Sequence, residues 1–206
     1  MHFLSFEGLD GSGKSTLMKT LAKYLRDLGR AVITTREPGG TPLAEDVRNL
    51  ILRVGEEAPV PRSELFLYEA SRAQHVAKVI RPALDQGTWV LCDRFSESSV
   101  AFQCYGRQLP RQQVDLLNRF AEDGVRPELV VLLDLPLEVA RARQGRRAEA
   151  ADRMEREADD FHQRVRRGFL EQSQEEPERW LVLDAALSAD ELFSLTRAEL
   201  ERRGWL

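Results

Sequence analysis

The sequence predicts an α/β fold in which five parallel strands form a sheet with helices on both faces. Two observations favour this fold. Short apolar runs recur along the 206 residues and alternate with longer stretches of helical pattern, and a glycine-rich loop joins the first run to the first helical stretch. Apolar strands that are separated by helices are typical of a parallel sheet that is buried on both sides.

The first elements follow in order from the N-terminus. Residues 3–6 are mostly apolar and precede the glycine-rich loop, so they are expected to form the first strand. A helix is expected over Lys14–Leu28, and Gly29 ends it because glycine readily adopts the left-handed conformation found after helix C-termini. Ala31–Thr35, which reads AVITT, is the second predicted strand.

The remaining elements repeat this alternation. A long helical stretch, Ser63–Asp85, stops before Gly87 and leads into the third predicted strand, Thr88–Cys92. The continuous apolar run Leu129–Asp134 is expected to form the fourth strand, and Trp180–Leu183 the fifth.

One segment breaks the composition of the chain. Arg141–Arg156 is strongly charged and almost free of large apolar side chains. It cannot pack into a core, so it is expected to be a surface segment that is able to move. We therefore expect a single domain over residues 1–206.

The composition also argues against several classes of partner. The net charge is −4, which gives no support for a surface that binds nucleic acid or an anionic membrane. No apolar run approaches the roughly 18 residues that span a bilayer, and the N-terminal MHFLSFEG has no signal-peptide features. Cys92 and Cys104 form neither a disulfide framework nor a CxxC metal pattern, so a reducing cytoplasm is the expected location.

The glycine-rich loop matches the phosphate-binding pattern G-x-x-x-x-G-K-[ST] in full. Its glycines let successive backbone N–H groups point at phosphate oxygens, and the following helix adds its positive N-terminal end. Lys14 is expected to face solvent or ligand and to supply a charge for the β- and γ-phosphates, while Ser15 offers a hydroxyl to Mg²⁺. The predicted ATP-binding residues are Gly8, Leu9, Asp10, Gly11, Ser12, Gly13, Lys14, Ser15 and Thr16. A glycine-rich turn without a ligand is the alternative.

A second group of polar residues follows the third predicted strand. Asp93 and Arg94 stand at the carboxyl end of that strand, where parallel sheets bind ligands. Arg94 is suited to grip an acceptor phosphate, and Asp93 to hold Mg²⁺ through water. Ser99 and Gln103 are four residues apart on one predicted helix face, where they could read a base edge or be ordinary helix polarity.

These features favour a small-molecule kinase with a P-loop fold. The chain is short, it lacks the guanine-reading N-K-x-D of GTPases, and it has clustered arginines beyond the needs of one nucleotide. Phosphoryl transfer depends mainly on positioning and on stabilisation of negative charge, so two phosphorylated substrates require such arginines.

Five segments together resemble the thymidylate kinase family of P-loop nucleoside monophosphate kinases, in its bacterial form. They are EGLDGSGKST, TREPGGTPLAEDVR, YEASRAQH, CDRFSESSVAFQ and ADRMERE, and they cover nearly the whole chain in order. The P-loop is shared by many families, whereas TREPGGT and D-R-x-x-x-S-x-x-A-[YF]-Q are close to diagnostic. The resemblance implies the reaction ATP + dTMP → ADP + dTDP with Mg²⁺, in deoxynucleotide synthesis.

The resemblance also implies roles in the acceptor site. Asp10 aligns with an acidic residue near the 3′-hydroxyl of the acceptor sugar, and Tyr68 with the aromatic ring that stacks on thymine, usually Phe. Arg72, one helical turn later, aligns with the arginine that donates to a thymine carbonyl. The full predicted dTMP-binding set is Asp10, Glu37, Pro38, Arg48, Tyr68, Arg72, Arg94, Ser99 and Gln103. Tyr68 as a core aromatic is the alternative, and His75 is expected to have a helix-surface or packing role rather than to act as an acid or base.

The resemblance implies that the arginine-rich segment, at approximately 141–156, is a lid that supplies the positive charge missing from this P-loop. Candidate lid arginines are Arg143, Arg146, Arg147 and Arg153, of which Arg146 and Arg153 are favoured as catalytic residues beside Lys14, Arg94 and Asp10. Such an arginine stabilises charge that develops on the transferring phosphoryl group. A solvated position is the alternative for each.

Some positions depart from the family pattern. Cys104 and Gln108 replace glycines that commonly flank the loop after Gln103, Phe102 replaces a common tyrosine, and Glu69 is unusual beside the stacking position. These departures put the local geometry and the discrimination against dUMP or UMP in doubt. The family further implies a homodimer, through apolar faces such as those within 50–52 and 65–79.

Two other functions stay open at this stage. One is a nucleoside or nucleoside-monophosphate kinase with another base preference. The other is a P-loop regulator that holds a nucleotide without transferring phosphate. A regulator needs no second site, so Arg94, Ser99, Gln103 and the lid arginines argue against it.

Overall fold

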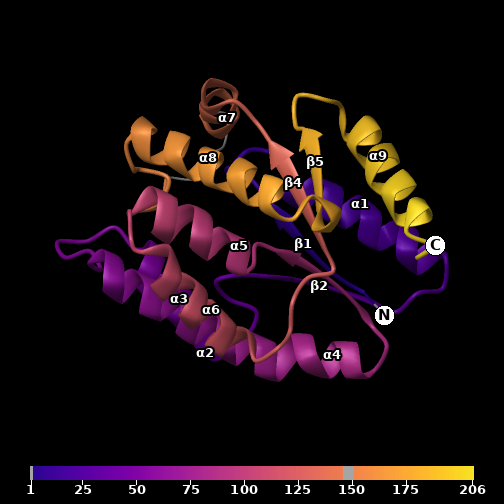
Figure 1. Cartoon of the computed structure of the whole chain (residues 1–206), viewed down its shortest axis with the longest axis horizontal. Coiled ribbons are helices and arrows are strands. Elements are labelled where there is room, and N and C mark those ends of the chain that lie inside the picture. The colour runs from indigo at the N-terminus through magenta and orange to yellow at the C-terminus, as the bar shows by residue number, and fades with distance from the viewer. Residues whose placement is uncertain (1, 146–150) are drawn as a thin grey trace.

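The computed structural model describes residues 2–145 and 151–206. Its centre is a five-stranded, all-parallel sheet in the order β2-β3-β1-β4-β5 (Figure 1). The strands are β1 Phe3–Glu7, β2 Val32–Arg36, β3 Trp89–Asp93, β4 Leu129–Asp134 and β5 Trp180–Asp184. All five strands were predicted, each within one residue of its observed bounds. Four of them are mostly apolar runs, and β2, which reads VITTR, begins with β-branched residues that favour strands.

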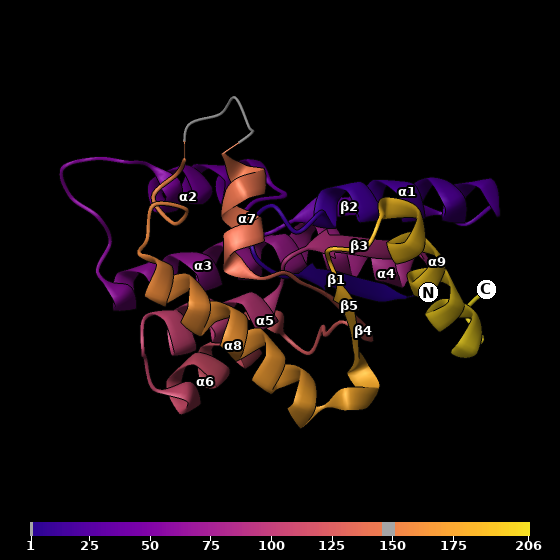
Figure 2. The same ribbon diagram turned by 90° about the horizontal axis from the view of Figure 1, so that it is seen from above.

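The helical elements connect the strands on both faces of the sheet. They are α1 Lys14–Asp27, α2 Pro42–Leu52, α3 Pro61–His75, η1 Val76–Ile80, α4 Arg81–Asp85, α5 Ser96–Ser99, η2 Val100–Gly106, α6 Arg111–Glu122, α7 Leu137–Gln144, α8 Asp159–Glu175, η3 Pro177–Arg179 and α9 Ala189–Arg202. Seen from above, α1 lies on one side of the strands and α8 on the other (Figure 2). The predicted stretch 63–85 is therefore observed as α3, the π-helical η1 and α4 in direct succession.

The alternation of side chains along the strands builds a core on each face. Leu4 and Phe6 of β1 join the larger cluster, to which α1 contributes Leu21, whereas Phe3 packs with Val90 and η1 on the other face. Strand residues alternate between the two faces of a sheet, so one apolar strand serves both clusters.

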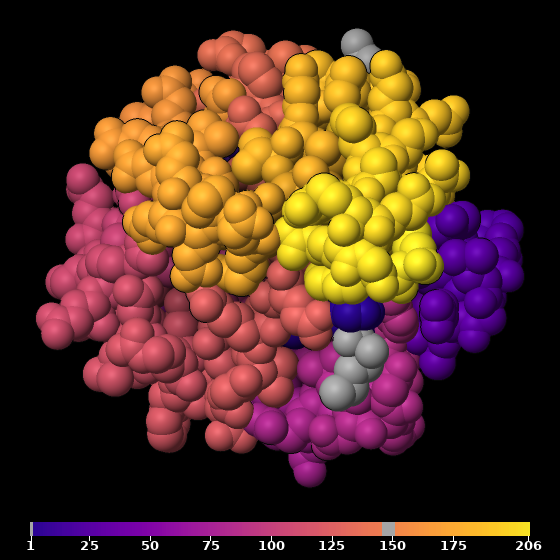
Figure 3. Space-filling model, turned by 45° about the vertical axis from the view of Figure 1, so that its right-hand side comes forward, coloured from indigo at the N-terminus to yellow at the C-terminus, as the bar shows by residue number. Residues whose placement is uncertain are grey.

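The two ends of the described chain meet. Trp205 stacks on the ring of His2, with centroids 4.0 Å apart. The yellow C-terminal segment lies at the upper right of the face shown in Figure 3. Within residues 2–145 and 151–206, no helix is both long and apolar enough to cross a membrane.

The parallel register decides where the site forms. Asp93, at the end of β3, is paired with Phe6 of β1 and with Arg36 of β2. The loops that follow these three strands, residues 8–13, 94–95 and 37–41, therefore leave the sheet at the same edge, as expected for ligand binding in an open α/β fold.

Candidate active site

The loop between β1 and α1 has the backbone that a phosphate cradle needs. Gly8 has φ 130°, and a Cβ atom there would lie 2.4 Å from the carbonyl oxygen of Leu133. Gly13 has φ 99° and caps the N-terminus of α1. Only glycine fits both conditions without strain, and this conformation lets N–H groups of the loop turn toward an anion at the N-terminus of α1. Ser12 Oγ is buried in this loop and has no hydrogen-bond partner among the described residues.

Lys14 lies against the loop and is not exposed. Its Nζ donates to the carbonyl oxygens of Gly8 at 3.1 Å and Leu9 at 3.2 Å, and the side chain is 6% exposed. Burial, and then the neighbouring Arg94, lower the pKa of Lys14 below its ordinary value. Lys14 therefore does not face solvent as the sequence allowed, because the loop folds over the ammonium group and the loop carbonyl oxygens accept its hydrogen bonds. Its contact with a ligand stays a prediction.

The two residues predicted to hold a metal lie together. Ser15 Oγ donates to Asp93 Oδ2 at 3.1 Å. A hydroxyl and a carboxylate fit Mg²⁺, which takes oxygen ligands and is usually held by one or two protein groups together with substrate phosphates and water. The described residues contain no group of three or more His, Cys, Asp or Glu side chains that could hold a metal. This donor set therefore suits an ion that arrives with a nucleotide.

A cavity of about 600 Å³ adjoins the loop. All nine residues of the predicted dTMP-binding set line it. The other lining residues are Leu52, Phe95, Ser98, Phe102, Arg141, Gln144, Gly145, Ala151, Asp152, Met154 and Glu155. The tertiary structure thus brings together residues from separate sequence segments, and we call this space the acceptor cavity.

Arg94 forms the side of the acceptor cavity nearest the P-loop. Its Nη2 donates to Asp10 Oδ1 at 2.8 Å, and its guanidinium carbon lies 5.0 Å from the centre of the Phe102 ring. Burial disfavours its charge, but Asp10 and Asp93 outweigh burial and raise the pKa of Arg94. With φ 71°, Arg94 also has a backbone conformation that non-glycine residues rarely adopt. A fixed, permanently charged group thus stands between the loop and the cavity.

Behind Arg94 lies a buried carboxylate that the sequence alone did not reveal. Glu7 has no exposed surface; it accepts hydrogen bonds from the backbone N–H of Phe95 at 2.8 Å and from Ser98 Oγ at 2.6 Å. Burial, followed by repulsion from Glu97, raises the pKa of Glu7 to about 8. Glu7 therefore anchors the turn that carries Arg94, and its charge is costly in the folded state.

The raised pKa gives a testable dependence of stability on pH. The folded protein holds the Glu7 proton more tightly than the unfolded chain, so Glu7 lowers the free energy of unfolding as the pH rises from about 4.5 to about 8. In Glu7→Gln the free energy of unfolding is expected to fall less over this pH range than in wild type, by up to about 3 kcal/mol. Denaturant unfolding at pH 5 and pH 8 measures it, with the exposed Glu201→Gln as control. Parallel pH curves for wild type and Glu7→Gln would refute the assignment.

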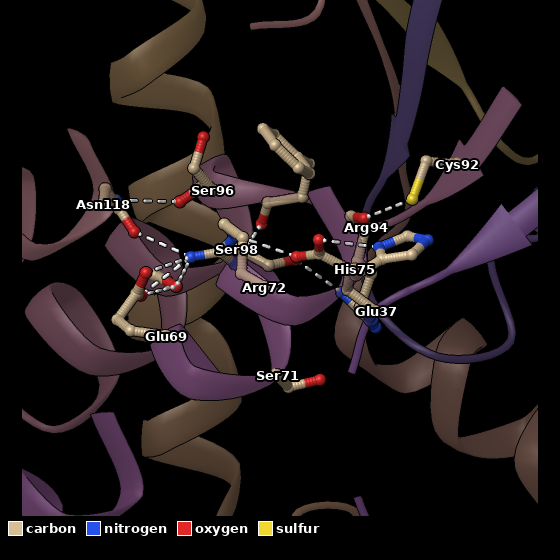
Figure 4. A network of polar contacts seen from close by, with 12 residues as sticks. Glu37, Glu69, Ser71, Arg72, His75, Cys92, Arg94, Ser96, Ser98 and Asn118 are labelled. Atoms are coloured by element: carbon tan, nitrogen blue, oxygen red, sulfur yellow. Dashed lines mark hydrogen bonds and ion pairs between the residues drawn. The ribbon is translucent and has the colours of Figure 1, made fainter. Parts of the chain in front are cut away.

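Arg72 is the centre of a buried polar network (Figure 4). Its Nε donates to Glu37 at 2.8 Å, and its Nη2 donates to the Phe95 carbonyl oxygen at 3.1 Å. Its Nη1 has three acceptors, which are Glu69 at 2.7 Å, Ser99 at 2.9 Å and Asn118 at 2.8 Å. The unusual Glu69 is thereby explained, because its carboxylate neutralises a guanidinium that is 2% exposed. The network fixes the orientation of Arg72 before any ligand binds.

The loop after β2 is tied to the same network. Glu37 accepts from Arg72 and also contacts His75 Nδ1 at 3.0 Å, while His75 Nε2 lies 2.6 Å from Thr35 Oγ1. Both ring nitrogens of this fully buried histidine are engaged, in agreement with the packing role expected for it. Arg48 Nη1 donates to the Pro38 carbonyl oxygen at 3.0 Å, so Arg48 braces the loop from α2.

Glu64 is a second buried carboxylate that was absent from the predicted site. It accepts from Gln103 Nε2 at 3.0 Å and from Arg153 Nη2 at 2.6 Å, and it has no exposed surface. Helical periodicity could have found it, because Glu64, Tyr68 and Arg72 are spaced four residues apart and therefore share one face of α3. Burial, and then Glu64, raise the pKa of Tyr68, whose neutral ring lines the acceptor cavity.

Side chains of the predicted lid contact the P-loop and the helices on the acceptor side. In α7, Gln144 Nε2 donates to the Asp10 carbonyl oxygen at 3.1 Å and Arg143 Nη1 to that of Gly11 at 3.4 Å. Arg153 is bound to Glu64 and to the Ile51 carbonyl oxygen at 2.7 Å, and it does not line the acceptor cavity. Its phosphoryl-stabilising role stays a prediction.

Arg146 and Arg147 lie outside the described residues.

Gln108 stands where the family commonly has glycine. Its φ of 59° lies in the left-handed region, which glycine adopts without strain, and this explains the common glycine.

Comparisons with known proteins extend over nearly the whole chain. The family model for thymidylate kinase matches residues 6–195. A thymidylate kinase of Bdellovibrio bacteriovorus is 54% identical over 98% of this chain and 97% of its own length, and one of Geobacter sulfurreducens is 47% identical over 89% and 88%. The crystal structure of a thymidylate kinase from Ehrlichia chaffeensis superimposes with a TM-score of 0.77 at 33% identity, and it covers 97% of this chain and 98% of that chain.

Proposed function

The chain belongs to the thymidylate kinase family, and on this basis we propose that it transfers the γ-phosphoryl group of ATP to the 5′-phosphate of dTMP. The products are ADP and dTDP. The observation that carries the proposal is the acceptor cavity, because one space next to the P-loop is lined by every residue of the predicted dTMP-binding set. A nucleotide-holding regulator has no use for such a second site.

The P-loop side would bind ATP. The loop N–H groups and Lys14 Nζ cradle the phosphates, and Lys14 exchanges its contacts with Gly8 and Leu9 for phosphate oxygens. Ser15 and Asp93 would hold Mg²⁺, which neutralises charge on the β- and γ-phosphates when bound. The chain's own contribution here is to fix these oxygens 3.1 Å apart at the N-terminus of α1.

The acceptor side would orient dTMP for in-line attack. Arg94 binds the acceptor phosphate and keeps its oxygen near the γ-phosphate, which converts transfer into a reaction between positioned groups. Asp10, held by Arg94 at 2.8 Å, accepts a hydrogen bond from the 3′-hydroxyl of the sugar. Tyr68 stacks on the base, and its raised pKa keeps the ring uncharged.

The base would be read by a donor and an acceptor. Nη2 of Arg72 has one hydrogen bond to Phe95 among the described residues, so its second N–H can donate to the 4-carbonyl of thymine. Gln103 addresses the neighbouring N3–H, and Ser99 holds Arg72 in place. Unpaired polar groups in such a site reject the wrong base strongly.

The lid would complete the transfer site. Closing over both substrates excludes water, which prevents wasteful hydrolysis of ATP. Arg153 and Arg146 remain the proposed sources of charge for the transferring phosphoryl group. Since Arg153 is bound to Glu64, this role requires Arg153 to exchange Glu64 for a phosphate when both substrates are present. A cytoplasmic location stays a prediction.

A panel of acceptors tests the proposed function. We expect ADP release from ATP and Mg²⁺ to be fastest with dTMP among dTMP, dUMP, UMP, CMP, GMP, AMP, thymidine and no acceptor. A faster reaction with another monophosphate would refute the thymidylate assignment while keeping the kinase. ADP release that does not depend on an acceptor would instead favour a nucleotide-holding protein.

We further propose that the protein forms a homodimer through α2, α3 and α6. These helices are neighbours (Figure 1) and carry several exposed apolar side chains, whereas Ile51 and Leu65 next to them are buried. The exposed residues are Leu43, Leu50, Phe66, Leu116 and Phe120, the last 85% exposed. An exposed apolar surface of this kind is typical of a protein interface.

Phe120→Lys is expected to weaken the dimer. In a symmetric dimer each subunit contributes Phe120 to the interface, so the substitution removes two apolar side chains from it. The dimer dissociation constant should therefore rise at least about 100-fold. Sedimentation velocity over a concentration series measures this. Leu195→Lys is the matched control, because it replaces a half-exposed leucine on α9. A wild-type protein that sediments as a monomer at all concentrations would refute the proposal.

A further inference from the structure

Glu64 lies behind the acceptor cavity and holds three side chains with one carboxylate. Oε1 accepts from Gln103 Nε2 at 3.0 Å and from Arg107 Nε at 3.0 Å, while Oε2 accepts from Arg107 Nη2 at 2.9 Å and from Arg153 Nη2 at 2.6 Å. Burial alone would raise the pKa of Glu64, but the bonds from Arg107, then those from Gln103 and Arg153, bring it below its ordinary value. The carboxylate therefore stays ionised, and an ionised carboxylate only accepts hydrogen bonds.

This chemistry fixes which end of the Gln103 amide faces the cavity. An amide has a donating and an accepting end, and only the donating Nε2 can bind Glu64. Glu64 does not line the acceptor cavity, whereas Gln103 does. The accepting Oε1 is thus left for a ligand, and no hydrogen bond to it occurs within residues 2–145 and 151–206.

We propose that Glu64 is a positioning residue that sets the base specificity of the enzyme through Gln103. By holding Nε2, it presents Oε1 to the base as an acceptor. Thymine and uracil donate N3–H to this oxygen, whereas N3 of cytosine is itself an acceptor and is rejected. The inference rests on the proposed function, since it assumes that a pyrimidine nucleotide occupies the acceptor cavity.

The substitution Glu64→Gln tests this inference. The oxygen of the introduced amide takes the place of Oε2, where two guanidinium groups donate to it, because this keeps two of the three bonds from arginine. Its NH₂ group then takes the place of Oε1, loses the bond from Arg107 Nε and meets Gln103 Nε2. Gln103 then rotates to offer Oε1 to that NH₂ group and Nε2 to the base. A donor now faces N3, which suits cytosine. We expect the ratio of kcat/KM for dTMP to that for dCMP to fall at least about 30-fold relative to wild type.

A double-mutant comparison shows whether Glu64 acts through Gln103. In a Gln103→Ala background, adding Glu64→Gln is expected to leave the dTMP to dCMP ratio unchanged within about threefold. Glu97→Gln is the matched control, because Glu97 is also a buried carboxylate paired with an arginine, at 2.5 Å from Arg179, but does not line the cavity. Its ratio should equal that of wild type.

The outcomes separate the inference from the proposed function. The role of Glu64 would be overturned if folded Glu64→Gln kept the wild-type ratio of kcat/KM for dTMP to that for dCMP. It would also be overturned if Glu64→Gln changed this ratio equally in the wild-type and Gln103→Ala backgrounds. Either result would leave the kinase assignment intact. Wild-type protein without activity on dTMP would overturn the proposed function itself. If Glu64→Gln does not fold, the double variant Glu64→Gln/Arg107→Met removes a guanidinium that would keep only Glu157 of its two carboxylate partners, and the same fall in the ratio is expected.

Discussion

Replacing Lys14 by methionine is expected to lower kcat at least about 10³-fold. In the proposed mechanism the ammonium group is the cation of the P-loop next to the transferring phosphates, and charge stabilisation of this kind contributes a large share of the rate of phosphoryl transfer. Methionine keeps the unbranched shape and most of the length of the lysine side chain and removes the charge. Since Lys14 is buried and its pKa is lowered, the folded state should lose little stability when the charge is removed.

Initial rates with saturating ATP, Mg²⁺ and dTMP measure the loss, and thermal unfolding confirms that the variant is folded. Lys23→Met on α1 is the control: Lys23 is 78% exposed and pairs only with Asp27 among the described residues. A Lys14→Met enzyme within about tenfold of wild-type kcat would mean that Lys14 keeps its contacts with Gly8 and Leu9 during catalysis.

Arg94→Ala is expected to act on the acceptor far more than on the donor. The value of kcat/KM for dTMP should fall about 10²- to 10³-fold, because a charge-assisted contact with the acceptor phosphate is lost from a buried site. The KM for ATP should change by less than about threefold. Arg94→Lys keeps the charge but loses the planar pair of donors, so an intermediate effect is expected.

Steady-state kinetics with each substrate varied in turn measure this difference. Arg126→Ala is the control, because Arg126 is 52% exposed and pairs with Glu176 away from the cavity. Equal increases in the KM for ATP and for dTMP would contradict the placement of Arg94 on the acceptor side. Loss of folding would instead reveal that Arg94 chiefly neutralises Asp10 and Glu7.

The apolar residues of the helices could not be divided between core and surface from the sequence. The expected dimer faces, 50–52 and 65–79, contain the buried Ile51, Leu65 and Val76 as well as the exposed Leu50 and Phe66. Apolar residues on an amphipathic helix face either the core or a partner. Which of the two holds depends on the neighbouring helices, and therefore on the fold.

The sequence by itself determined the sheet, the P-loop and, through the family resemblance, a set of residues that lines the acceptor cavity. Apolar strands, a glycine pattern and spacings of four residues are local features, and the parallel topology then brings strand ends to one edge. Charge burial is different, because it depends on partners distant in the chain. Glu7 meets Ser98 across 91 positions, and Glu64 meets Arg153 across 89.

Only the tertiary structure therefore decided how the charged residues work. It buried Lys14 against its own loop, although the motif suggests an accessible ammonium. It surrounded Arg72 with Glu37 and Glu69, so that little of its guanidinium is left for a base. A charged group buried from water needs a partner of opposite charge or a hydrogen bond, and which residue supplies it is settled by the packing of the whole chain.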